Sequence, residues 1–262
     1  MLRPRIIPCL LVSNKGLVKT VKFKNPKYVG DPINAVRIFN EKETDELMIL
    51  DIDATKLNKE PDYRSIEFWA SECRMPLCYG GGIKTVEQAQ RIFSLGVEKV
   101  ALSSEAIYNT KIISKIAERV GSQSVVVVLD AKKKTFGGYE LFTHNASKST
   151  GLNAIDFAKK CVEEGAGEIV INSIDRDGTM KGYDLNLTQR VRNIIDTPMT
   201  VLGGAASLDD LGTLINEFGI IGASAGSLFV FRGKYKAVLI NYPSKNQKNS
   251  LIAHNLNIYN NI

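Results

Sequence analysis

Short apolar runs recur along the chain, and each is followed by polar turn residues and then by an amphipathic helical pattern. The runs are rich in Val, Ile and Leu and do not alternate with polar residues, which is typical of strands buried on both faces of a parallel sheet. Eight strands that alternate with helices predict an α/β protein with a (β/α)8 (TIM) barrel, and an open doubly wound sheet is the main alternative. The eight runs cover residues 5–12, 46–52, 75–81, 99–104, 124–130, 168–174, 198–204 and 219–225.

Capping residues mark the starts of several predicted helices. Asp31 followed by Pro32 supplies an N-cap and a first-turn proline. Capping boxes are expected at Thr85–Gln88 and Ser207–Asp210, and each precedes apolar residues at helical spacing.

An internal repeat favours the closed barrel over the open sheet. Residues 46–53 and 168–175 share the pattern Glu, four apolar residues, any residue, Ile, Asp, with Asn172 as the exception at the fourth apolar position. A unit of four βα pairs that is present twice is most simply a barrel built from two halves. In this repeat the first strand corresponds to the fifth at a nearby offset, and Leu11 then matches Asp130. The positions offset by 122 residues are Glu46 and Glu168, Asp53 and Asp175, and Gly81-Gly82 and Gly203-Gly204.

Length and composition fit one large domain. The chain has 262 residues, of which 44% are hydrophobic and 24% charged. We expect a single barrel over 1–243 and an asparagine-rich tail over 244–262, which is either disordered or a weak helix. No apolar run reaches 18 residues and the N-terminus lacks a signal-peptide pattern, so we expect a cytoplasmic protein without a membrane span. Cys73 and Cys78 have no second pair at zinc spacing, so we expect reduced cysteines and neither a metal nor another cofactor.

The net charge of +6 is partly local, with two lysine clusters at Lys19 to Lys27 and Lys132 to Lys134. No nucleic-acid motif or aromatic platform accompanies them, so nucleic acid is not an expected partner. An anionic small molecule explains them equally well, and solvated loop charge is the alternative.

Glycines and carboxylates gather at the predicted strand ends, where barrels of this class carry their active sites. Glycines let backbone N–H groups approach an anion closely, so two glycine sets on opposite halves suit a ligand with a phosphate at each end. Asp130 ends an otherwise apolar run and is the best candidate for general acid/base chemistry. The structural alternatives are tight barrel turns for the glycines and a loop-capping role for the aspartate.

The segments RIIPCL, GDPINAV, DELMILDI, GGGI, GSQSVVVVLDAK, TGLNAIDF, GAGEI and SIDRDGT resemble the cyclase (HisF) subunit of imidazole glycerol phosphate synthase over residues 1 to about 240. The resemblance implies a (β/α)8 barrel of histidine biosynthesis that forms a heterodimer with a HisH-like glutaminase. In that family ammonia enters at the N-terminal end of the barrel and reacts with a bis-phosphorylated ribulose substrate at the C-terminal end.

Site residues follow from the resemblance position by position. Asp130 matches a catalytic aspartate, and Lys19, Asp51 and Asp177 match residues near the substrate. Ser103 stands where the family usually has asparagine. The phosphate sites match Gly81, Gly82, Ser103, Gly178, Gly203, Gly204, Gly226 and Ser227. The charged ring of the ammonia gate matches Arg5, Glu46, Lys99 and Glu168, although a structural salt-bridge set is the alternative.

One departure changes the functional prediction. Leu11 replaces the family's other catalytic aspartate, and a general acid/base group typically contributes roughly 10²–10⁴-fold in rate. Leu202 also makes one phosphate neighbourhood more apolar than is usual in the family. Autonomous cyclase (lyase) activity is therefore in doubt.

Three functions remain open. The Leu-Leu-Val of strand one and YVGDPINAVRIFN resemble a divergent branch associated with bacterial surface polysaccharides, including lipopolysaccharide. That likeness implies a barrel that supplies ammonia, with a glutaminase and an ATP-dependent amidotransferase, for amidation of an acetamido sugar. The alternatives are the histidine-pathway cyclase and a non-catalytic scaffold that activates the glutaminase.

Overall fold

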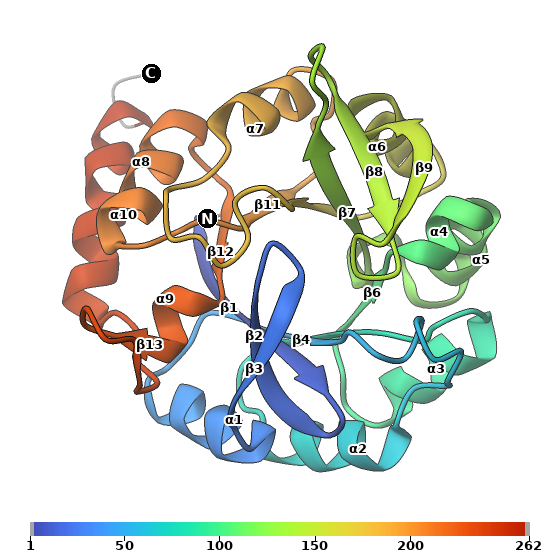
Figure 1. Ribbon diagram of the computed structural model, residues 1–262, viewed down its shortest axis with the longest axis horizontal. Coiled ribbons are helices and arrows are strands. Elements are labelled where there is room, and N and C mark those ends of the chain that lie inside the picture. Colours follow the sequence, from blue (N-terminus) through green and yellow to red (C-terminus); the bar gives the residue numbers. More distant parts are fainter. Residues whose placement is uncertain (1–2, 260–262) are drawn as a thin grey trace.

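The computed structural model describes residues 3–259, and within them eight parallel strands close into a barrel (Figure 1). Strand β1 pairs with β4 on one side and with β12 on the other, and β7 pairs with β10, so the sheet has no free edge among these strands. The predicted barrel is confirmed and the open sheet is excluded. The barrel strands are β1 (Arg5–Ser13), β4 (Leu47–Asp51), β5 (Leu77–Gly80), β6 (Lys99–Leu102), β7 (Val125–Lys133), β10 (Glu168–Ser173), β11 (Met199–Leu202) and β12 (Gly222–Ala225).

Helices surround the barrel in Figure 1 and begin where capping was predicted. The Asp31 carboxylate accepts the N–H of Ile33, and both predicted capping boxes form, at Thr85–Gln88 and Ser207–Asp210. The helices are α1 (Pro32–Glu41), α2 (Tyr63–Glu72), α3 (Val86–Ser94), α4 (Ser104–Tyr108), α5 (Lys111–Val120), the 3₁₀ helix η1 (Ser122–Ser124), α6 (Ala154–Glu163), α7 (Leu185–Arg192), α8 (Leu208–Phe218), α9 (Ser227–Val230) and α10 (Lys245–Tyr259).

Three β-hairpin segments extend from this framework and were not predicted from the sequence. Hairpin β2–β3 lies across the front of the barrel in Figure 1, and it contains the first lysine cluster. Its tight turn places the non-glycine residues Lys22 and Phe23 at positive φ, so no Asn-Gly or Asp-Gly signal marks it. The strands are β2 (Gly16–Val21), β3 (Lys24–Gly30), β8 (Tyr139–Thr143), β9 (Lys148–Asn153), β13 (Phe231–Arg232) and β14 (Ala237–Val238).

The two halves repeat one another in backbone contacts as well as in sequence. Ile52 donates its N–H to the Val12 carbonyl at 3.0 Å, and Ile174 donates to the Ala131 carbonyl at 2.9 Å. The Asp53 carboxylate accepts the N–H of Asn14, and that of Asp175 accepts the N–H of Lys133. The 122-residue offset therefore corresponds to equivalent places in the barrel.

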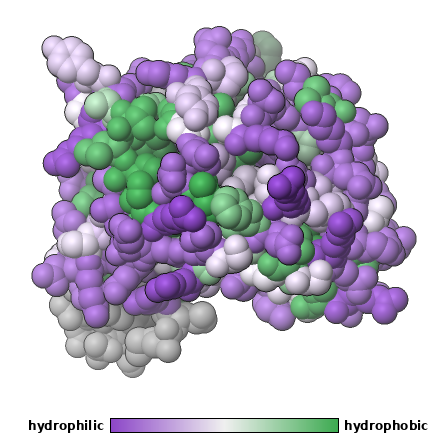
Figure 2. Space-filling model, turned by 90° about the horizontal axis from the view of Figure 1, so that it is seen from below, coloured by the Kyte–Doolittle hydropathy of each residue, from purple (hydrophilic) through white to green (hydrophobic). Residues whose placement is uncertain are grey.

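Apolar side chains form one core between the barrel and its helices and a second core inside the barrel. Figure 2 shows a largely hydrophilic surface on the face viewed, with one larger apolar area and several smaller ones. No helix in the described part of the chain is long and apolar enough to cross a membrane. The second core contains Ile7, Cys9, Met48, Cys78, Ala101, Val126, Val128, Val170 and Leu202.

The segment after Pro243 contains α10, which packs against α8. Lys248 Nζ lies 2.9 Å from Asp45 Oδ1 and also donates to the Glu43 carbonyl. The hydroxyl of Tyr242 donates to the Ile6 carbonyl at 2.8 Å. These bonds attach the start of the segment to the N-terminal end of the barrel. Residues 260–262 of the predicted tail lie outside the described part.

Candidate functional site

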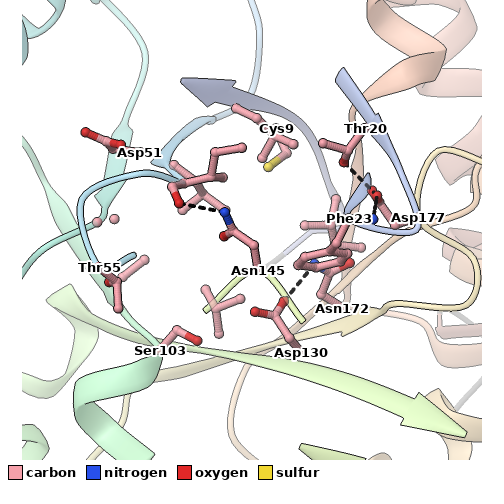
Figure 3. Close-up of a pocket in the computed structure, with 18 of the residues that line it drawn as sticks. Cys9, Thr20, Phe23, Asp51, Thr55, Ser103, Asp130, Asn145, Asn172 and Asp177 are labelled. Atoms are coloured by element: carbon pink, nitrogen blue, oxygen red, sulfur yellow. Dashed lines mark hydrogen bonds between the residues drawn. The ribbon is translucent and has the colours of Figure 1, made fainter. Parts of the chain in front are cut away.

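A cavity of about 380 Å³ opens at the carboxyl ends of the barrel strands (Figure 3). This is the end of the barrel where enzymes of this architecture place their active sites. Every residue predicted for the catalytic and phosphate or substrate sites lines it, although their functional roles stay predictions. These residues are Lys19, Asp51, Gly81, Gly82, Ser103, Asp130, Asp177, Gly178, Gly203, Gly204, Gly226 and Ser227.

Asp130 projects into the cavity from β7 and has one side-chain partner. Asn172 Nδ2 donates to Asp130 Oδ1 at 2.9 Å. Burial raises the pKa of Asp130 to about 7, with a further contribution from Asp177, although the bond from Asn172 acts in the opposite direction. A carboxyl group that titrates near neutral pH can both accept and donate a proton there.

The equivalent place in the first half of the barrel is apolar. Asp130 and Asn172 are paired positions on β7 and β10, and Leu11 and Leu50 are paired positions on β1 and β4. Both leucines are partly buried and pack against the interior core. The cavity floor therefore has one polar pair and one apolar pair, and Leu11 cannot transfer a proton.

The β2–β3 hairpin brings Lys19 into the cavity. Its Nζ is buried and donates to the Cys9 carbonyl at 2.6 Å, and this burial lowers the pKa of the ammonium. A Cβ at Gly226 would lie 2.5 Å from that nitrogen, so glycine at this position leaves space for the lysine head group. Lys22, Lys24 and Lys27 are exposed on the hairpin.

Asp177 attaches the hairpin to the loop after β10. Its Oδ2 accepts the Thr20 hydroxyl at 2.8 Å and the Phe23 N–H at 3.1 Å. Burial raises its pKa, although these two bonds and nearby Lys19 act in the opposite direction. Gly178 lies so close to the hairpin that a Cβ there would be 2.0 Å from the Thr20 carbonyl oxygen. Both residues therefore position Lys19 as well as lining the cavity.

Asp51 shapes the loop after β4. Its Oδ1 accepts the N–H groups of Asp53 at 2.9 Å and Ala54 at 3.1 Å, which is the local turn that aspartate commonly forms. Burial raises its pKa, whereas the two N–H groups lower it. A Cβ at Gly81 would lie 2.6 Å from the Asp51 carbonyl oxygen, so this glycine permits close packing of two loops.

Several cavity residues were not identified from the sequence. His144 and Asn145 lie in the turn between β8 and β9, and both have positive φ. Asn145 Nδ2 donates to the Ile52 carbonyl at 2.8 Å, which links this turn to the loop after β4 (Figure 3). The ring of His144 lines the cavity beside Tyr108. Only the polar turn composition could have signalled this segment.

The four predicted gate residues form a closed ring of charges near the N-terminal ends of their strands. Arg5 bonds to Glu46 and, at 2.7 Å, to Glu168, and Lys99 lies 2.9 Å from both glutamates. Burial opposes ionisation of Glu168, but Arg5 and Lys99 hold the pKa of its carboxyl well below the usual range. The interior core lies on the strands between this ring and the cavity. The ring is assembled as predicted, and its role as an ammonia gate stays a prediction.

Comparison with known proteins gives this architecture a family. The family model described as Histidine biosynthesis protein matches residues 5–236. The chain belongs to this family, among its HisF members.

The HisF relatives match this chain over nearly its full length. A Vibrio vulnificus (strain YJ016) protein is 61% identical over 95% of this chain and 96% of its own. A Leptospira interrogans protein is 60% identical over 96% and 99%, and a Pseudomonas aeruginosa protein is 52% identical over 94% and 98%. They carry the provisional names imidazole glycerol phosphate synthase subunit hisF3, HisF and hisF2, respectively.

Among the described residues, no three His, Cys, Asp or Glu side chains form a group that could hold a metal ion. The cavity of this HisF-family chain brings together the carboxyl of Asp130, the amide of Asn172, the amino group of Lys19 and the glycine-rich loops, alongside the other polar side chains that line it.

Proposed function

We propose that the chain is an ammonia-conducting barrel that pairs with a HisH-like glutaminase and supplies ammonia for amidation of an acetamido sugar in surface polysaccharide biosynthesis. An ATP-dependent amidotransferase activates the sugar in this proposal. The single observation that carries it is the apolar pair Leu11–Leu50, which occupies the place where a second acid would be needed for imidazole ring closure.

The interior of the barrel supports the conducting role. Neutral ammonia crosses an apolar interior more easily than an ammonium ion, because burying an unpaired charge is costly. The ring of Arg5, Glu46, Lys99 and Glu168 lies at one end of that interior, and the cavity lies at the other. The two cations and two carboxylates balance in charge. If this ring of side chains opens to admit ammonia, it therefore leaves no net charge facing the core.

Reconstitution tests the proposal directly. The chain, the glutaminase, the amidotransferase, ATP and the acetamido sugar are combined with amide-¹⁵N-labelled glutamine. We expect ¹⁵N in an acetamidino product, and omission of the chain should abolish the transfer from glutamine. Equal labelling without the chain would contradict the proposal. The scaffold alternative predicts a rise in glutamine hydrolysis without any transfer that depends on the barrel interior.

The cyclase subunit of imidazole glycerol phosphate synthase is the second candidate. The names of the chain's relatives favour this second candidate, as do the retained Asp130 and the glycine loops of the cavity. In that reaction ammonia and the bis-phosphorylated ribulose substrate (PRFAR) give imidazole glycerol phosphate, aminoimidazole carboxamide ribotide (AICAR) and water. Asp130 would then carry both proton transfers.

A cyclase assay separates the two candidates. With ammonium salt and the ribulose substrate, we expect little or no imidazole product from the wild-type chain. Turnover close to that of a two-aspartate cyclase would refute the first proposal. Leu11→Asp alone sets a carboxylate against Leu50, whereas Leu11→Asp with Leu50→Asn rebuilds the pair found on β7 and β10. We expect the double variant to gain more cyclase activity than the single variant.

A further inference from the structure

The amide of Asn172 has a buried acceptor without a partner. Among the described side chains, Asn172 Oδ1 is the one buried nitrogen or oxygen atom that makes no hydrogen bond, and the residue is only 6% exposed. Leaving a buried polar group unpaired costs roughly 1–3 kcal/mol, so native proteins rarely do so outside functional sites. The carbonyl oxygen of this amide therefore calls for a ligand that donates.

The hydrogen bond to Asp130 determines which end of the Asn172 amide is available to a ligand. A carboxylate only accepts hydrogen bonds, so the Nδ2 group must face Asp130, as it does at 2.9 Å (Figure 3). Oδ1 is then the end available to a molecule in the cavity. A Cβ at Gly203 would lie 3.1 Å from Oδ1, so this glycine leaves open space beside the acceptor.

Asn172 also stands at the boundary between the apolar interior and the cavity. Side chains alternate along a strand, so Glu168, Val170 and Asn172 of β10 all face the barrel axis. Glu168 belongs to the charged ring and Val170 to the interior core. Asn172 is thus the first polar side chain on this strand beyond the ring, at the cavity.

The barrel itself does not require an amide at this place. Leu50 occupies the equivalent position of the first half and packs against the same interior core. Packing alone would therefore be satisfied by an apolar residue at 172. The amide is a property of the polar half of the cavity floor.

We propose that Asn172 binds the incoming nitrogen, with Oδ1 accepting an N–H from an ammonia molecule that leaves the apolar interior. Ammonia has three N–H donors and one lone pair, so this bond uses a donor and leaves the lone pair free to attack an acceptor. This inference rests on the proposed function for the arrival of ammonia, and it adds the residue that holds it.

Side-chain NMR of the full-length chain tests binding without any acceptor substrate. The amide resonances of Asn172, assigned with Asn172→Leu, are followed during addition of ammonium chloride at fixed alkaline pH and compared with potassium chloride at equal ionic strength. We expect a shift with ammonia alone. Asn145 is the internal control, since it lines the same cavity but its Nδ2 is bonded to the Ile52 carbonyl and its Oδ1 is not buried without a partner. Equal shifts of both amides, or no shift of Asn172, would overturn the proposal.

Steady-state kinetics of the reconstituted complex with ammonium salt in place of glutamine gives a second readout. Loss of one neutral hydrogen bond is worth about a tenfold change, so we expect Asn172→Leu to raise KM for ammonium about tenfold with kcat nearly unchanged. Asn172→Ser keeps a hydrogen-bond acceptor, so its KM for ammonium should lie between those of the wild type and Asn172→Leu. An equal fall in kcat with both variants and no change in KM would indicate a structural role only. An NMR shift of Asn172 without any amidated sugar would refute the proposed function but support the nitrogen site. Amidated sugar with neither the NMR shift nor the rise in KM would support the proposed function and refute the nitrogen site.

Discussion

Glu168→Gln is expected to destabilise the protein strongly, because it removes one of two buried carboxylates from the charged ring. Its side chain is 5% exposed and accepts bonds from Arg5 at 2.7 Å, Lys99 at 2.9 Å and the Thr200 hydroxyl at 2.6 Å. A glutamine amide has the same shape but presents an NH₂ group to one of these donors. Arg5 and Lys99 then share the single carboxylate of Glu46.

The magnitude follows from burial. Removing one partner of a buried ion pair typically costs 3–5 kcal/mol, and here two cations lose half of their counter-charge, so we expect a loss of roughly 4 kcal/mol. The ion pair between Arg37 and Glu72 is the matched control, since it is also bidentate but its side chains are 52% and 33% exposed. Glu72→Gln should have no measurable effect on stability, as is common for solvated pairs.

Urea denaturation of both variants beside the wild type measures this difference. Because Arg5 and Lys99 depress the pKa of Glu168, its contribution is present above the ordinary glutamate range and is lost as pH falls through the depressed value. The difference between wild type and Glu168→Gln should therefore shrink in acid. A loss at neutral pH no larger than that of Glu72→Gln would refute the ring as a source of stability.

Three further predictions concern the cavity and the barrel. Asp130→Asn should stabilise the protein above pH 7 and have little effect near pH 4. The pKa of Asp130 is about 7 in the folded protein and about 3.9 in the unfolded chain, so ionisation of this group lowers the free energy of unfolding by at most roughly 4 kcal/mol. A pH-independent difference in urea midpoints would contradict this. Gly222→Ala should cost roughly 1–3 kcal/mol because its Cβ would lie 1.9 Å from Thr200 Oγ1, and equal stability in thermal unfolding would show that the strand can shift. Asn145→Ala should increase hydrogen exchange in the β8–β9 turn through loss of its bond to Ile52, with unchanged exchange in β7 as the control, and protection equal to wild type would refute that link.

The barrel could be predicted because the patterns that specify its strands and helices lie within short segments of the sequence. Each parallel strand is a short run of Val, Ile or Leu, and the capping boxes at Thr85 and Ser207 mark helix starts within a few residues. The glycine and aspartate positions followed from one topological rule, that strand ends of a barrel meet at one face. The internal repeat, continued to the first and fifth strands at a nearby offset, matched Leu11 with Asp130 without any structure.

The contacts that give the cavity its chemistry join residues from different segments of the chain, so they could not be predicted from local sequence patterns. Lys19 is one of several lysines in its cluster, and only the fold of the β2–β3 hairpin distinguishes it as buried at the Cys9 carbonyl. Asn172 lies within an apolar run, and in the sequence it differs from its neighbours only as an exception to the repeat. Its pairing with Asp130 depends on the register of β10 against β7, which no single segment encodes.

The two ends of the barrel differ in what they require from its two halves. The ring needs a glutamate from each half, because one buried carboxylate could not balance both Arg5 and Lys99. The cavity floor has no such requirement, since a leucine pair packs as well as an Asp–Asn pair at equivalent positions. Chemistry at the cavity can therefore change without disturbing the ring or the interior. A barrel that keeps the ring while one half of its floor is apolar is what we expect when delivery of ammonia is retained and ring closure is not.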